Sequence, residues 1–94
     1  MKIVEIVKSP LRRKRYRVIL SNGRHYDFGL DIGRTYIDHH DKDKRKAYWA
    51  RHYTGKEKQL IDNLKPSPAL FSAYLLWGDS IDLHTNIDNL NRIF

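Results

Sequence analysis

The sequence has 94 residues, with 18 lysines and arginines against 11 acidic residues and no cysteine. A chain of this length can bury one hydrophobic core without covalent cross-links, so a single domain over residues 1–94 is expected. The lack of cysteine excludes disulfides, thiolate metal sites and cysteine nucleophiles. No apolar run reaches 18 residues and no signal-peptide pattern opens the chain, which predicts a soluble protein of the cell interior with no membrane partner.

The positive charge is concentrated in the first two thirds of the chain. Residues 1–34 carry nine lysines and arginines against three acids, and residues 35–65 carry eight against five. Residues 66–94 carry only one basic residue against three acids. This asymmetry indicates one face directed at a polyanion and another used for packing or protein contact, unless the charge serves only solubility.

A three-stranded antiparallel meander is predicted for residues 1–28. Residues 2–7 are rich in β-branched side chains, and a second strand-like run covers residues 13–20. Asn22-Gly23 then precedes a third run that ends at Phe28. Asn-Gly between two such runs is a strong hairpin signal, so a two-residue loop is expected here.

This loop length sets an expected register for the hairpin. It pairs Ile19 with Tyr26 and Arg17 with Phe28, so that Ile19, Tyr26 and Phe28 share one face of the sheet. The other face would then carry Val18, Leu20, His25 and Asp27.

Residues 29–40 are expected to form a connection, followed by a helical layer over residues 41–94. Asp41 can cap a first helix that runs to about Tyr53. Thr54-Gly55-Lys56-Glu57 has the form of a capping box and predicts a second helix, which Pro66 must end.

Ser67-Pro68 predicts the start of a third helix, which Gly78 closes. Because this segment is apolar almost all round, it is expected to be the central buried helix. Asp79 or Ser80 should cap a last helix with a single apolar stripe of Leu83, Ile87, Leu90 and Phe94. The predicted fold class is α+β, a small three-stranded antiparallel sheet followed by three to four helices.

The first candidate site is the basic cluster that enters the hairpin. In an extended strand Arg13, Arg15 and Arg17 project to one side, where they could follow the phosphates of a nucleic acid. Two other interpretations stay open: edge-strand charges that prevent aggregation, and a nuclear-import-like cluster. The candidate nucleic-acid-binding residues of this cluster are Arg12, Arg13, Lys14, Arg15 and Arg17.

The second candidate site is one face of the helix that follows Asp41. At about 100° per residue, Trp49 and Tyr53 fall on a buried side. The outer side then carries Tyr48 amid basic residues, a pattern suited to phosphates and to one stacked base, although charged helix faces are commonly only solvated. The candidate residues here are Lys44, Arg45, Tyr48 and Arg51.

A group of histidines and aspartates offers a third, remote candidate. Asp38, His39, Asp41 and His52 could supply nitrogen and oxygen ligands to a metal, as in small one-metal nucleases. The spacing matches no helical paired-histidine motif, however. The simpler interpretation is that Asp38 and Asp41 cap the helix and that His52 interacts with its dipole, so no cofactor is expected.

The spacing of these residues resembles a family of short proteins encoded by nucleocytoplasmic large DNA viruses. In that pattern a basic hairpin leads to Phe-Gly, Gly, Tyr, Asp-His, a spaced Asp, an Arg-x-x-Tyr-x-x-Arg-His run and a Leu-Leu-Trp motif before a final amphipathic helix. The matching residues are Phe28-Gly29, Gly33, Tyr36, Asp38-His39, Asp41, Arg45, Tyr48, Arg51-His52 and Leu75-Leu76-Trp77-Gly78. The resemblance implies an accessory or virion protein and implies no reaction.

These observations together predict a non-enzymatic viral protein that binds nucleic acid through its basic hairpin and helix face, with a role in genome packaging. DNA is expected ahead of RNA, and the location is the virion or the interior of the infected cell, in cytoplasm or nucleus. A minor capsid-associated protein that contacts an acidic viral protein surface is the alternative, and a metal-dependent nuclease is the remote one. The oligomeric state stays open.

Overall fold

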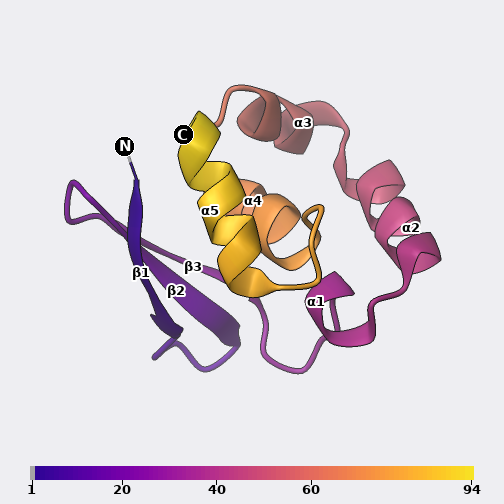
Figure 1. The fold of residues 1–94 in the computed structure, drawn as a ribbon, viewed down its shortest axis with the longest axis horizontal. Coiled ribbons are helices and arrows are strands. Elements are labelled where there is room, and N and C mark those ends of the chain that lie inside the picture. The colour runs from indigo at the N-terminus through magenta and orange to yellow at the C-terminus, as the bar shows by residue number, and fades with distance from the viewer. Residues whose placement is uncertain (1) are drawn as a thin grey trace.

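The computed structural model describes residues 2–94, which begin with a three-stranded antiparallel sheet (Figure 1). The strands are β1 (Ile3–Lys8), β2 (Lys14–Leu20) and β3 (His25–Leu30), and their order in the sheet is β1-β2-β3. The predicted meander is therefore confirmed, with β2 in the centre.

The register of the hairpin differs by one residue from the predicted one. Ile19 pairs with His25 and Val18 with Tyr26. The loop has three residues because the Gly23 amide closes a turn onto the Leu20 carbonyl at 2.9 Å and only Gly23, at φ 85°, adopts the left-handed conformation. A one-residue shift reverses the faces of a strand. The core face consequently carries Tyr16, Val18, Leu20, Tyr26 and Phe28, and not Ile19.

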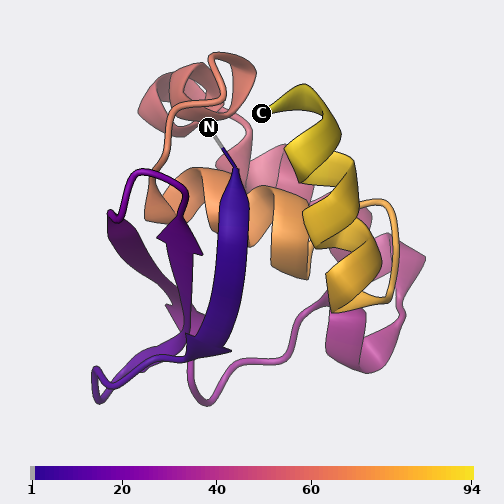
Figure 2. The same cartoon turned by 60° about the vertical axis from the view of Figure 1, so that its left-hand side comes forward.

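The helices follow in one continuous run. They are α1 (Tyr36–His39), α2 (Lys42–His52), α3 (Gly55–Asp62), α4 (Pro68–Phe71), a π-helical turn η1 (Ser72–Leu76) and α5 (Leu83–Ile93). Figures 1 and 2 show α4 and η1 packed beside the sheet, with α5 alongside them and with α2 and α3 on the far side. The α+β class is confirmed, and no helix in residues 2–94 is long and apolar enough to cross a bilayer.

The segment from α4 through η1 is the centre of the core. Leu70, Phe71 and Leu75 are fully buried, as the nearly uniform apolar pattern predicts. Tyr74 and Trp77, which belong to the same apolar segment, are only partly buried, because they face a second and smaller cluster beneath α2 and α3. The predicted stripe on α5 also packs on the main core, through Leu83, Ile87, Leu90 and Phe94.

Two of the predicted helix starts are confirmed by their hydrogen bonds. Asp41 accepts from the amides of Asp43 and Lys44 at the start of α2, and Ser67 accepts from the Leu70 amide at the start of α4. Thr54 precedes α3 as expected but makes no side-chain cap bond.

Three predicted boundaries are wrong. The α3 helix ends four residues before Pro66, because Leu64 turns left-handed at φ 50° and the amides of Leu64 and Lys65 bond back to the last turn in a Schellman arrangement. The cap of α5 is Asp82, not Asp79 or Ser80. The predicted connection over residues 29–40 holds the end of β3 and helix α1.

Two asparagines of α5 attach this helix to the rest of the fold. The buried Asn86 amide donates to the carbonyls of Leu75 and Ser80 and accepts from the Ser80 amide, so it fixes the connection that enters α5. Asn91 exchanges two hydrogen bonds of 2.8 and 3.0 Å with the backbone of Ile3. These bonds hold the start of β1 beside the last turn of α5 (Figures 1 and 2).

Candidate nucleic-acid interface

The two central arginines of β2 are engaged inside the molecule. The Arg15 guanidinium makes two hydrogen bonds of 2.6 Å to the Asp38 carboxylate, and Arg17 makes two of 3.0 and 3.1 Å to Asp27. These arginines hold the pKa of both carboxyl groups below the ordinary range, chiefly through hydrogen bonds to the charged form. Arg15 and Arg17, the last two members of the predicted phosphate-binding row, therefore already have carboxylate partners inside the molecule.

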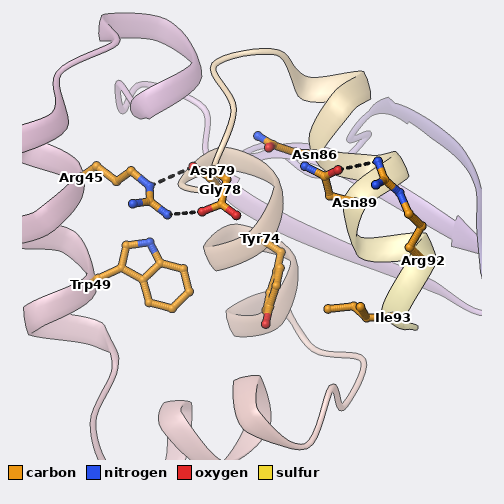
Figure 3. Close-up of a pocket in the computed structure, with 9 residues that line it drawn as sticks. All are labelled: Arg45, Trp49, Tyr74, Gly78, Asp79, Asn86, Asn89, Arg92 and Ile93. Atoms are coloured by element: carbon orange, nitrogen blue, oxygen red, sulfur yellow. Dashed lines mark hydrogen bonds and ion pairs between the residues drawn. The ribbon is translucent and has the colours of Figure 1, made fainter.

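Arg45 is also occupied, in a hollow between α2, η1 and α5 (Figure 3). Its Nε donates to the carbonyls of Trp77 and Gly78 at 3.1 and 2.8 Å, and its Nη2 donates to Asp79 at 3.0 Å. Arg92, on the other wall, donates to Asn89. The hollow has a volume of about 550 Å³, but both of its guanidinium groups already have protein partners. Arg45 thus fastens α2 to the core.

Tyr48 is not the exposed aromatic that the helical projection predicts. Its ring lies in parallel contact with Trp77, at a centroid distance of 4.4 Å, and stacks on His52 at 4.3 Å. Burial raises the pKa of Tyr48 to about 12, so the phenol stays neutral. Tyr48 lies on the buried side of α2 because its ring packs on Trp77. The Trp49 indole N–H also donates to the Trp77 carbonyl, at 2.8 Å. Tyr53, placed on the buried side by the sequence, is 36% exposed.

Several candidate cations remain on the surface. Arg12, Arg13, Lys44 and Arg51 are exposed and Lys14 is half-buried. Residues 2–94 provide no ion pair to any of them. They are the members of the predicted set that can still meet an external anion.

A hollow of about 420 Å³ brings two of these cations together with a third that sequence reasoning missed. Lys14 comes from the start of β2, Arg34 from the connection after β3 and Arg51 from the last turn of α2. We call this hollow the basic cleft. Leu76, Trp77, His52 and Glu57 also line it.

The sheet topology explains why Arg34 lies there. In an antiparallel hairpin the end of β3 returns to the start of β2, and Leu30 pairs with Lys14. Residues that follow β3 therefore lie beside the turn before β2. Arg12 and Arg13 border a neighbouring hollow that also includes Leu30, so they extend the positive surface beyond the cleft. Lys44 does not line the cleft. In the sequence, the only local signal for Arg34 is its position directly before Thr35, the N-cap of α1.

The metal candidates do not come together. Residues 2–94 hold no group of three or more histidine and acidic side chains placed to bind a metal ion. Asp38 binds Arg15 and closes the capping box of α1, Asp41 caps α2, and His52 contacts Glu57 at 3.2 Å. The capping interpretation is confirmed for Asp41, whereas Asp38 caps the shorter helix α1 and not α2.

His39 has an unusual environment. Its Nδ1 accepts from the Asp41 amide at 3.0 Å, which places the proton of the neutral ring on Nε2. The Nε2 atom is buried without a hydrogen-bond partner in the described chain. Its ring lies against Trp77 at a centroid distance of 5.3 Å. His39 is thus a packing residue next to Trp77.

The comparisons with known proteins give a family and nothing more. A family described as a family of unknown function, DUF5754, matches residues 4–52, just over half of the chain. The chain belongs to this family. No curated protein and no solved structure matches it. The matched region contains the sheet, α1 and α2, and thus all three cations of the basic cleft.

Proposed function

We propose that this protein binds nucleic acid, with its phosphates held along the basic cleft by Lys14, Arg34 and Arg51. The observation that carries the proposal is the convergence of these three cations from separate elements onto one hollow. Arg12 and Arg13 continue the same surface at the turn before β2. Glu57 is the one acid that lines the cleft within the described chain, so the lining keeps an excess of positive charge.

The proposal is for binding without catalysis. The resemblance to proteins of large DNA viruses adds a context of genome packaging in the virion or the infected cell, with DNA ahead of RNA as the polymer. Backbone contacts of this kind are independent of sequence, because phosphates carry no base information. A Kd on the order of 10⁻⁴–10⁻⁶ M near physiological salt is expected for such contacts.

The test is a salt titration of fluorescence anisotropy with labelled duplex and single-stranded oligonucleotides. Five contacts, from Arg12, Arg13, Lys14, Arg34 and Arg51, give a log–log slope of about −4.5 on duplex DNA and about −3.5 on single strands. Replacing Arg34 and Arg51 by Gln should flatten the duplex slope by about 1.8.

The matched control replaces Arg24 and Arg92 by Gln. These changes remove the same charge from the tip of the β2–β3 hairpin and from α5, neither of which lines the cleft. The control should leave the slope within about 0.5 of the unmodified protein. Equal flattening by both pairs would show diffuse attraction without a site, and no binding at ~50 mM salt would refute the proposal.

A second candidate function is contact with an acidic protein surface, as in a minor capsid-associated protein. It is favoured by Ile32 and Leu30, which are 91% and 65% exposed beside Arg12 and Arg13. Exposed apolar side chains next to cations suit a protein interface more than a phosphate backbone. Mass spectrometry of proteins that co-purify after nuclease treatment tests this function. A partner retained by the native chain and lost with Ile32→Ser would support it, whereas equal recovery with both chains would oppose it.

A further inference from the structure

The basic cleft contains the exposed end of an aromatic column. Tyr48 stacks on Trp77 with an interplanar angle of 3° and on His52 with an angle of 27°. Trp77 and His52 make no ring contact with each other, so they cover opposite faces of Tyr48. His52 is the outer member of this column, and it lines the cleft together with Arg51.

One face of the His52 ring remains open. Tyr48 covers the other face, and the Glu57 carboxylate meets the ring edge at Nδ1. The His52 side chain is nevertheless 40% exposed, so part of its ring surface away from Tyr48 is accessible to a ligand. A flat aromatic group placed there would continue the column by one layer, as bases do on imidazole and other aromatic rings.

The groups around this open face suit a nucleotide. Arg51 is adjacent in sequence, and Lys14 and Arg34 line the same cleft, so cations are available for the phosphates on either side of an inserted base. Glu57 uses Oε2 to contact His52, while its Oε1 makes no hydrogen bond within residues 2–94. The Glu57 side chain is 46% exposed, and its carboxylate can accept a hydrogen bond from an exocyclic amino group.

On the basis of the proposed nucleic-acid function, we propose that the basic cleft seats one unpaired base of a single strand, stacked on the open face of His52. The base inserts next to Glu57, which favours cytosine, whose N4 amino group donates, over thymine, whose O4 would face the carboxylate. The site thus selects single strands over duplexes, since a paired base is already stacked on both faces.

The experiment measures the fluorescence anisotropy of four labelled probes, each about ten nucleotides long, at ~50 mM salt. The probes are oligo-dC, oligo-dT, an abasic phosphodiester strand of equal length, and a duplex. Removal of the bases should weaken binding about tenfold, as base–aromatic stacking predicts. Oligo-dC should bind roughly threefold to tenfold more tightly than oligo-dT, and Glu57→Gln should remove this preference, because an amide can donate to O4.

The variants separate stacking from folding. His52→Ala should reduce oligo-dC affinity about tenfold, to that of the abasic strand, whereas His52→Phe should retain it because a phenyl ring preserves the stack. The control is His84→Ala, which removes an exposed imidazole on α5. If His52→Ala does not fold, the comparison of intact and abasic strands on the native chain still tests the stack.

The outcomes distinguish this inference from the proposed function. Equal binding of the intact and abasic strands, or equal loss of affinity in the alanine and phenylalanine variants, would overturn base stacking and leave phosphate binding in place. Equal affinity for oligo-dC and oligo-dT would overturn the role of Glu57. Absence of binding to every probe would overturn both proposals.

Discussion

The pairing of Arg15 with Asp38 shows how one side chain can join two parts of this fold. Arg15 lies on the central strand and Asp38 in α1, and the same carboxylate accepts from the Thr35 amide and hydroxyl at 2.8 and 2.9 Å. Both partners are largely shielded from water, with side chains 20% and 25% exposed. The pair therefore fixes the start of α1, and with it the connection that carries Arg34 to the basic cleft.

Acid should weaken this link. Because the pKa of Asp38 in the folded protein lies well below its ordinary value of 3.8, the pair stabilises the fold fully above about pH 4. This stabilisation is lost as the pH falls through the window between 3.8 and the folded pKa. Asp38→Asn should cost about 1–3 kcal/mol at pH 7 and flatten the acid limb of the stability curve.

Urea denaturation between pH 7 and pH 2.5 measures this effect, with Asp88→Asn as the control. Asp88 is exposed, and residues 2–94 provide it with no ion pair. Parallel curves for the native chain and the Asp38→Asn variant would contradict the predicted linkage.

At the scale of elements, the three-residue β2–β3 loop is the connection that fits the register with Val18 and Leu20 in the core. Gly23 is left-handed at φ 85°, and a Cβ added there would meet no atom within 4 Å. Gly23→Ala should therefore destabilise through backbone strain alone, by about 1 kcal/mol. Gly33→Ala is the matched control, because Gly33 has no positive φ and its nearest contact would be an ordinary 3.4 Å. Equal thermal melting temperatures for the two variants would contradict the loop assignment.

The π-helical turn η1, unlike the β2–β3 loop, is defined by its packing against neighbouring residues. The Trp77 amide bonds to the Ser72 carbonyl five residues back, and the adjacent Gly78 approaches Tyr74 so closely that a Cβ would lie 2.2 Å from its carbonyl oxygen. Such turns are rare and often lie next to functional sites. Here the turn directs Trp77 under α2, where it supports the column that ends at His52.

Leu75 tests the burial of this element. It is fully buried between the sheet and α5, so Leu75→Ala should cost ~2–5 kcal/mol in chemical denaturation. Ile93→Ala serves as the control, because Ile93 is 54% exposed on α5 and should cost less than about 1 kcal/mol. A cost below about 0.5 kcal/mol at Leu75 would contradict its place in the core.

At the scale of the whole molecule, the fold contains two hydrophobic clusters of unequal size. The main cluster joins the sheet, α4, η1 and α5, whereas the smaller one, formed by Tyr48, Ile61 and Ala73, holds α2 and α3. Trp77 contacts both clusters. The half of the molecule that carries Arg51 and His52 thus rests on a smaller cluster of buried apolar side chains than the sheet does.

This inequality predicts a hierarchy of local stability. Backbone amides of α2 and α3 should exchange with deuterium before those of β2 and η1, because fewer buried contacts oppose their opening. A bound oligonucleotide should slow exchange in α2 more than in α5 if Arg51 and His52 contact it. Native-state hydrogen exchange measures both effects, and uniform protection in all elements would contradict the two-cluster description.

The sequence by itself determined the elements that depend on local chemistry. The β-branched runs, the Asn-Gly turn, the caps at Asp41 and Ser67 and the uniformly apolar segment around Leu75 predict the sheet, the helix starts and the central helix. Each of these signals acts within a few residues of the structure that it specifies. These signals can therefore be recognised in the sequence without knowledge of the rest of the molecule.

Tertiary structure decided the features that depend on distant partners. The register of the hairpin differs by one residue from the register that a two-residue turn predicts, because Val18 and Leu20 pack into the core. Tyr48 turned inward because Trp77, 29 positions later, receives its ring. Arg15 and Arg17 form ion pairs with Asp38 and Asp27 and do not line the basic cleft. Arg34 lines the cleft because the end of β3 lies beside the start of β2. A charge count cannot distinguish a paired from a free arginine, since pairing depends on which elements the fold brings within a few ångströms of each other.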